Sequence, residues 1–274
     1  MLKSLLKTSI KIQKHTMSGR ETITYRIKEL DPDMIAPSTK NMDRLEQGGS
    51  KIVIIGKPGT GKTTLITSLL YEKSHIFPMG VAMSGTEDSN GHYSKIFPSS
   101  FVFNVIDKPV IEQFINRQKL AKQHLPCPWG ILLLDDCTDD PKIFNDPMFL
   151  GLYKNGRHWK MLFILSLQYS LDIKPAIRTN IDGTFILRET NLRNRKILWE
   201  NYCGVVGDFQ TFCDILDQLT DDYTALYVHN ATTSNKAEDC LFWYKAKPVP
   251  EHFRIGSDDY WDFHDQRFDE KAAQ

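Results

Sequence analysis

The residues most able to do chemistry lie in one short segment. Residues 56–63 read Gly-Lys-Pro-Gly-Thr-Gly-Lys-Thr and match the pattern G-x-x-x-x-G-K-[ST]. In this pattern the backbone N–H groups of a glycine-rich loop surround phosphate oxygens, the lysine reaches the β- and γ-phosphates, and the hydroxyl ligates Mg²⁺. The sequence therefore predicts a site for ATP and Mg²⁺. The residues expected to contact the nucleotide are Gly56, Lys57, Pro58, Gly59, Thr60, Gly61, Lys62, Thr63 and Thr64.

Two acidic residues follow an apolar run further along the chain. Residues 131–134 are Ile-Leu-Leu-Leu, and Asp135 and Asp136 come directly after them. A strand that ends in acids places carboxylates at the carboxyl edge of a sheet, where ligands bind in open α/β folds. We expect Asp135 to hold Mg²⁺ together with Thr63, directly or through water. Asp136 is expected to polarise the attacking water.

A third β-type run, residues 161–165, has near each end a residue that could contact a phosphate group. Gln168 follows the run and is expected to contact the γ-phosphate or the attacking water. Arg157 precedes the run and is placed to reach the phosphate of a neighbouring subunit, where an arginine supplied in trans raises turnover by roughly 10³–10⁵. A surface arginine near a helix end is an equally weighted interpretation. Arg178 is a second candidate for the same role.

Two further features carry weaker hypotheses. Glu87 and Asp88 follow residues 80–83, and these acids are candidates for coupling the nucleotide state to a bound polymer, although a polar loop is expected after a strand in any case. Cys137, next to Asp136, is interpreted as a small packing residue rather than a nucleophile.

The elements that must position these residues alternate along the chain. Alternation of apolar β-type runs with helix-type periodicity is typical of a parallel sheet covered by helices on both faces, so the predicted fold class is α/β. The run at 161–165 is expected to lie between the strand of the glycine-rich loop and the strand of Asp135. The β-type runs are residues 51–55, 80–83, 101–105, 131–134, 161–165, 184–187, 224–228 and 241–244, and the helix-type segments are residues 62–71, 109–124, 191–202 and 209–219.

Composition excludes several classes of protein. The chain has 274 residues, 41% of them hydrophobic, and 34 basic residues balance 34 acidic ones, so it is neither disordered nor a basic coat for nucleic acid. Its five cysteines include no Cys-x-x-Cys pair, which excludes a zinc ribbon and favours a reducing compartment. The apolar runs are shorter than the roughly 20 residues that span a bilayer.

The balanced charge is distributed unevenly. Residues 1–20 carry five basic residues and no acid, and Leu2, Leu5, Leu6 and Ile10 recur at near-helical spacing. This pattern predicts a basic amphipathic segment that contacts a membrane surface or nucleic acid. A mitochondrial transit peptide and a solvated leader are the alternatives, and the leader has at least equal weight. Residues 251–274 carry seven acids against three basic residues. We expect a basic extension at 1–45, an ATPase core at 46–190, its completion at 191–250 and an acidic tail at 251–274.

Four segments together resemble a known family. The loop GKPGTGKT, the segment SGTEDSN, the strand ILLLDDC and the stretch GRHWKMLFILSLQ leading into IKPAIRTNID resemble the virion DNA-packaging ATPases of large double-stranded DNA viruses, of the poxvirus type, within the FtsK/HerA superfamily. The resemblance covers residues 50–190 and implies a RecA-like P-loop fold with an added strand between the Walker A and Walker B strands. Asp136 departs from the glutamate that many superfamily members carry as the second Walker B acid.

The resemblance also implies roles and partners. Lys62 and Thr63 match the Walker A residues, Asp135 and Asp136 the Walker B pair, Gln168 the sensor, and Arg157 a trans-acting arginine. The implied activity is Mg²⁺-dependent ATP hydrolysis, stimulated by DNA, that threads duplex DNA into a capsid. The implied partners are double-stranded DNA, capsid or portal proteins and a homo-oligomeric ring of about five or six subunits. The implied location is the viral assembly site in the host cytoplasm, and the virion.

Other P-loop proteins fit less well. Residues 235–238, Asn-Lys-Ala-Glu, come near the Asn-Lys-x-Asp motif of a GTPase, but no Asp-x-x-Gly follows residue 135. A small-molecule kinase does not require two acids after the Walker B strand. An AAA+ or helicase-like DNA motor and an ATP-binding assembly switch without translocation remain open as alternatives.

Overall fold

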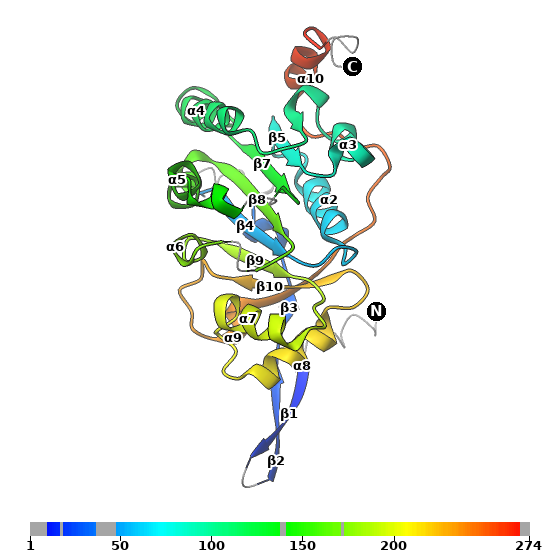
Figure 1. Ribbon diagram of the computed structural model, residues 1–274, viewed down its shortest axis with the longest axis vertical. Helices are drawn as coiled ribbons and strands as arrows, with labels where there is room; N and C mark the ends of the chain where they lie inside the picture. The colour runs from blue at the N-terminus through cyan, green and yellow to red at the C-terminus, as the bar shows by residue number, and fades with distance from the viewer. Residues whose placement is uncertain (1–9, 17–18, 37–47, 138–140, 171–172, 269–274) are drawn as a thin grey trace.

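The computed structural model describes residues 10–16, 19–36, 48–137, 141–170 and 173–268, and these build a mixed α/β fold around one large sheet (Figure 1). All neighbouring strands in this sheet run parallel except that β10 is antiparallel to both β9 and β11. The predicted α/β class with a mainly parallel sheet is therefore confirmed. In spatial order the strands are β3 (Lys28–Glu29), β11 (Leu241–Lys245), β10 (Thr224–His229), β9 (Gly183–Ile186), β4 (Ser50–Ile55), β8 (Met161–Leu167), β7 (Gly130–Asp135), β5 (Gly80–Ser84) and β6 (Val102–Phe103).

The three central strands read as continuous apolar runs because both of their faces are covered. Every residue of β4, β8 and β7 is buried, as is usual for parallel strands between two helical layers. Strand β8 lies between β4 and β7, which confirms the predicted insertion. Its register pairs Ile55 with Leu167 on one side and Leu134 with Leu165 on the other.

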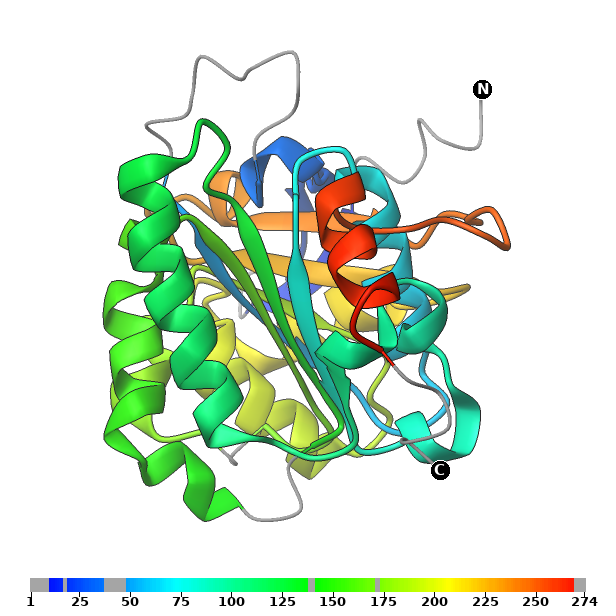
Figure 2. The same ribbon diagram turned by 90° about the horizontal axis from the view of Figure 1, so that it is seen from above.

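Helices cover both faces of the sheet (Figure 2). Among the described residues, the helices of eight residues or more are α2 (Lys62–Lys73), α4 (Lys108–His124), α5 (Pro147–Asn155), α7 (Leu192–Tyr202), α8 (Phe209–Leu219) and α10 (Asp258–Asp265). Alternate residues of β4 face opposite sides: Val53 and Ile55 join the core beneath α4, α5, α7 and α8, and Ile52 and Ile54 join the core beneath α2. Among the described residues, no helix is both long and apolar enough to cross a membrane.

Near the N-terminus the structure corrects the helical interpretation. Strands β1 (Ile10–Thr16) and β2 (Gly19–Tyr25) pair as an antiparallel ribbon that projects from the large sheet (Figure 1). The amphipathic helix expected to include Ile10 is therefore wrong from that residue onward, because both segments contain β-branched residues and their backbones pair with each other along the whole ribbon. Leu2, Leu5 and Leu6 lie outside the described residues.

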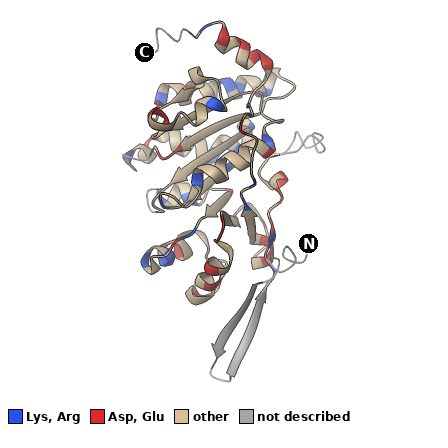
Figure 3. Cartoon of the chain, turned by 90° about the vertical axis from the view of Figure 1, so that its right-hand side faces the viewer, with Lys and Arg blue, Asp and Glu red and all other residues tan. Residues whose placement is uncertain are grey.

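Parts of the two terminal segments belong to the core. Leu30 and Ile35 are 2% exposed although they fall within the predicted extension at 1–45. In the acidic segment, acidic residues gather on α10 (Figure 3) and are exposed, yet Ile255 and Tyr260 are buried. The Tyr260 hydroxyl donates a hydrogen bond to the Gly80 carbonyl, and its ring packs on Phe101. The acidic segment up to residue 268 is thus docked beside β5.

Removing the Tyr260 ring tests this docking. Tyr260→Ala deletes a buried aromatic side chain and its hydrogen bond, so we expect the free energy of unfolding to fall by about 3 kcal/mol. Phe263→Ala, on the same helix but 47% exposed, should change it by less than about 1 kcal/mol. Urea titrations of both variants measure the difference. Equal effects would contradict the docking of α10 through Tyr260.

Candidate active site

The glycine-rich loop connects β4 to the N-terminus of α2, the connection that a phosphate site requires. The Gly56 N–H donates to the Leu167 carbonyl at 3.1 Å, which ties the start of the loop to β8. The N–H and the hydroxyl of Thr60 both donate to the Lys57 carbonyl, at 3.2 and 2.7 Å. Gly59 and Gly61 have φ values of +76° and +96°, a region that favours glycine. The loop is therefore folded into a compact turn above the helix.

Lys62 lies between the loop and the acids. Its ammonium donates to the Gly56 carbonyl at 3.0 Å and lies 3.5 Å from Asp136 Oδ2. The side chain of Lys62 is 5% exposed and that of Asp136 is 20% exposed, so the two charges compensate each other in a desolvated setting. Asp136 adopts a left-handed backbone with φ of +50°, which turns the chain sharply at the end of β7. The structure thus brings Lys62 and Asp136 together, as their predicted roles require.

Asp135 and Thr63 also converge. The Thr63 hydroxyl lies 3.4 Å from Asp135 Oδ2, and Asp135 is 3% exposed. Among the described residues, the buried oxygens Oδ1 of Asp135 and Oδ1 of Asp136 have no hydrogen-bond partner. Buried acceptors rarely remain unpaired without a reason such as a bound ion or water.

These oxygens fit a magnesium site. Mg²⁺ prefers oxygen ligands and is held in nucleotide sites by one or two carboxylates together with substrate phosphates. Within the described part of the chain, no group of three or more His, Cys, Asp and Glu residues could hold a metal by itself. The Thr63 hydroxyl and the Asp135 carboxylate would therefore hold Mg²⁺ jointly with the nucleotide.

Sequence reasoning missed Tyr93, which supports Asp135 from the side. Its hydroxyl donates to Asp135 Oδ2 at 2.7 Å. Burial and the nearby Asp135 charge raise the pKa of Tyr93 well above its ordinary value, so the hydroxyl stays protonated and remains a donor. No local pattern marks Tyr93, because it lies 42 residues from Asp135 in the sequence.

Glu87 orders the segment that carries Tyr93. It is 6% exposed, and its two carboxylate oxygens accept hydrogen bonds from the backbone N–H groups of Tyr93 and Ser94 at 3.0 and 2.9 Å. A buried carboxylate with these partners does not face a polymer, so the expectation for Glu87 is not supported. Asp88 is exposed and accepts a hydrogen bond from Asn104.

Cys137 packs beside the acids. Burial raises its pKa to about 12, which keeps the thiol protonated and unreactive. The structure therefore agrees with the interpretation of Cys137 as a packing residue.

A second group missed by sequence reasoning anchors Lys57 in the loop. The Lys57 ammonium lies 2.5 Å from Glu189 Oε1. Glu189 also accepts hydrogen bonds from the Asn191 N–H at 2.7 Å and from the Asn194 amide at 3.0 Å. Burial opposes the ionisation of Glu189, but the hydrogen bonds from Lys57, Asn191 and Asn194 outweigh it and lower the pKa. Lys57 is thus tied to the segment after β9, which pairs with β4.

Gln168 lies directly after β8 and is exposed. The pairing of Ile55 with Leu167 places it at the same edge of the sheet as Gly56. It makes no hydrogen bond to the described residues, and its role as a sensor stays a prediction.

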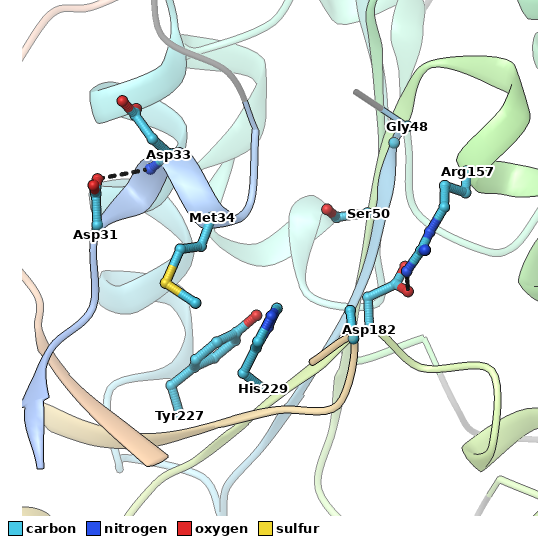
Figure 4. A pocket seen from close by; sticks show the side chains of 11 residues that line it. Asp31, Asp33, Met34, Gly48, Ser50, Arg157, Asp182, Tyr227 and His229 are labelled. Atoms are coloured by element: carbon cyan, nitrogen blue, oxygen red, sulfur yellow. Dashed lines mark hydrogen bonds and ion pairs between the residues drawn. The ribbon is translucent and has the colours of Figure 1, made fainter. Parts of the chain in front are cut away.

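Arg157 lies at the opposite edge of the sheet, before β8. Its side chain is 48% exposed and forms an ion pair with Asp182 (Figure 4). Asp182 also accepts a hydrogen bond from the Lys51 N–H at 2.9 Å, and the Lys51 ammonium lies 3.4 Å from it. Arg157 and Asp182 line a pocket of about 350 Å³ that also contains His229. Arg178, at the end of the short helix α6 (Pro175–Arg178), donates to the Ile173 carbonyl at 2.6 Å.

The sequence is similar to proteins of two invertebrate iridescent viruses. Protein 088R of Invertebrate iridescent virus 3 is 50% identical over 244 residues, a match covering 88% of this chain and 94% of that protein. Protein 075L of Invertebrate iridescent virus 6 is 48% identical over 257 residues, covering 93% and 99% respectively. No model of a protein family matches the chain.

Solved structures with low sequence identity share the fold. The DNA-packaging ATPase B204 from Sulfolobus turreted icosahedral virus is 17% identical, with a TM-score of 0.52 over 73% of this chain and 98% of B204. The pCW3 conjugation coupling protein TcpA is 11% identical, with a TM-score of 0.52 over 87% of this chain and 65% of TcpA. These neighbours confirm the RecA-like P-loop fold.

The contact between Tyr93 and Asp135 generates a prediction for metal use. Tyr93→Phe removes a hydrogen bond to a carboxylate expected to hold Mg²⁺, so we expect the Mg²⁺ concentration for half-maximal nucleotide hydrolysis to rise about tenfold. Tyr153→Phe is the matched control, because Tyr153 is equally buried but its hydroxyl has no hydrogen-bond partner among the described residues. Hydrolysis rates measured across a Mg²⁺ titration compare the two. An unchanged Mg²⁺ requirement in Tyr93→Phe would show that Tyr93 does not support the metal site.

Proposed function

This chain belongs to the same family as the iridescent-virus proteins 088R and 075L, and we propose that it is an ATP-hydrolysing motor that moves double-stranded DNA into a viral capsid. The observation that carries the proposal is the convergence of Lys62, Asp136 and the pair Thr63 and Asp135 at the end of the glycine-rich loop. The fold that it shares with the packaging ATPase B204 supports the same assignment. A relationship to the poxvirus-type packaging ATPases is part of this proposal.

Each residue has a role that follows from its position. The backbone of the loop and the Lys62 ammonium bind the β- and γ-phosphates. Thr63 and Asp135 orient Mg²⁺, which neutralises phosphate charge when bound. Asp136, held near Lys62, accepts a hydrogen bond from the attacking water and orients it toward the γ-phosphate. Gln168 contacts this water or the γ-phosphate from the end of β8.

The proposal extends to an assembly. We propose a homo-oligomeric ring around duplex DNA that works with capsid or portal proteins at the viral assembly site in the host cytoplasm. A net charge of +0 is compatible with this role, because a motor needs releasable phosphate contacts and tight, sequence-independent binding would hold it in place. A membrane-surface contact through residues 1–20 stays a prediction.

Two substitutions separate binding from hydrolysis. Lys62→Ala should weaken ATP binding and turnover together, because the ammonium contacts the phosphates in both states. Asp136→Asn should keep ATP bound but lower turnover at least about 100-fold, because an amide is a poor acceptor for the water proton. Calorimetry gives the affinities, and phosphate release with and without duplex DNA gives the rates. Near-normal turnover in Asp136→Asn would overturn the assignment of Asp136.

The wild-type protein provides the decisive test of the motor. We expect duplex DNA to raise its rate of ATP hydrolysis. ATP binding with no turnover at any DNA concentration would instead favour an assembly switch.

Mixed assemblies test the role of Arg157. Arg157→Ala should bind ATP but hydrolyse it roughly 1,000-fold more slowly, because an arginine that acts in trans contributes at least that factor. When it is mixed with Lys62→Ala, which lacks the loop ammonium but keeps Arg157, part of the activity should return, because the intact loop of one subunit then receives the arginine of the next. Arg178→Ala, which changes the alternative candidate, should stay active when measured alone. No recovery of activity in the mixture would exclude action in trans by Arg157.

A further inference from the structure

A tyrosine in a strained turn lies against the phosphate loop. Asp222 and Tyr223 connect α8 to β10, and both adopt left-handed backbone conformations with φ of +50° and +57°. Residues other than Gly, Asn and Asp rarely adopt this region, because the Cβ atom approaches the following carbonyl. A bulky aromatic residue in this conformation is a backbone outlier of the kind found at ligand sites.

Several interactions hold the turn in place. The Thr224 N–H donates to the Asp221 carbonyl at 3.0 Å and closes the turn. The Ala246 N–H donates to the Tyr223 carbonyl at 3.1 Å, and Lys245 forms an ion pair with Asp222. The backbone of Tyr223 is therefore held in place by the β10–β11 pair.

The ring of Tyr223 lies against Gly61, the residue directly before α2. A methyl group added to Gly61 would lie 2.8 Å from Tyr223 Cδ1, so the ring occupies the space that any larger residue at 61 would need. Tyr223 nevertheless remains 57% exposed. The structure thus presents an aromatic surface to solvent within contact distance of the loop.

We propose that Tyr223 stacks on the base of the bound nucleotide and that this contact favours purine over pyrimidine nucleotides. The inference rests on the proposed function, because it requires the triphosphate to occupy the loop at residues 56–63. Gly61 directly precedes Lys62, so a ring against Gly61 borders the phosphates, and the base extends from them through the ribose. Because the turn holds the backbone of Tyr223 before the ligand arrives, stacking requires ordering of the ring alone. A purine offers a larger stacking surface than a pyrimidine.

The experiment compares a ligand that has a base with one that lacks it. Calorimetry in Mg²⁺ would measure the affinities of the full chain for ATP, UTP and inorganic tripolyphosphate. Tyr223→Ala should weaken ATP binding about tenfold, the size expected for loss of one base–aromatic stack. Its affinity for tripolyphosphate should stay within about twofold of the wild-type value, and Tyr223→Phe should keep ATP affinity within the same limit. The preference of wild-type protein for ATP over UTP should shrink in Tyr223→Ala.

Two controls separate stacking from a structural effect. Tyr223→Gly removes the ring but relieves the left-handed backbone, so it should lose ATP affinity as Tyr223→Ala does while its free energy of unfolding does not fall. Tyr71→Ala removes another exposed ring, 39% exposed, from the opposite end of α2, and should bind all three ligands as the wild-type protein does.

Three outcomes would overturn the proposal. They are unchanged ATP affinity in Tyr223→Ala, equal loss of ATP and tripolyphosphate affinity, and a wild-type protein that binds tripolyphosphate as tightly as ATP. Failure of the proposed motor is seen separately, as normal nucleotide binding without DNA-stimulated hydrolysis. A wild-type protein that binds neither ligand would reject nucleotide binding itself, and the proposal with it.

Discussion

The requirement that governs this structure is that three charges must be removed from water while remaining available to a ligand. Lys62 and Asp135 are 5% and 3% exposed, and Asp136 lies 3.5 Å from the Lys62 ammonium. A buried charge without partners is strongly destabilising, whereas a paired and hydrogen-bonded one is tolerated. One hydrogen bond joins Lys62 to the loop carbonyl of Gly56 and another joins Asp135 to the Tyr93 hydroxyl, while Oδ1 of Asp135 and Oδ1 of Asp136 have no partner among the described residues. The site is therefore stable only when β4, β7 and the segment that carries Tyr93 are all correctly positioned.

Strand β8 sets the spacing of this site. Because β8 lies between β4 and β7, the phosphate loop and the two acids begin about 10 Å apart, which is two strand spacings. The long side chain of Lys62 spans part of that distance and reaches Asp136. Gln168 directly follows β8 and is exposed at this edge of the sheet. The inserted strand thus separates the phosphate loop from the two acids and places Gln168 between them.

The sequence predicted the parts of the site whose chemistry is local. The spacing of residues 56–63 and the acids after an apolar run identify a phosphate loop and the carboxylates near it, because a strand followed by a turn determines where such residues lie. The central strands were also predictable from local sequence, because burial on both faces requires continuous apolar runs.

The supporting residues could not be predicted in this way. Tyr93 and Glu189 contact the site through tertiary pairings, and neither belongs to a motif that spacing reveals. Tyr223 was missed because its conformation, not its residue type, marks it. Near the N-terminus, the spacing of apolar residues suggested a helix, but from Ile10 onward the backbone forms the β1–β2 ribbon. The spacing of apolar residues in one segment does not show whether a partner strand follows it.

The two ends of β8 explain why one subunit is not a complete catalyst under the proposed mechanism. Arg157 precedes the strand and Gln168 follows it, so seven extended residues separate them by about 23 Å. An arginine side chain does not bridge that distance, and Arg157 therefore cannot reach the nucleotide of its own subunit. Within the subunit, its guanidinium is instead neutralised by Asp182. A neighbouring subunit's triphosphate, with more negative charge than one carboxylate, would compete with Asp182 for that guanidinium. Any role of Arg157 in hydrolysis therefore requires assembly, and the Arg157–Asp182 ion pair must open for it.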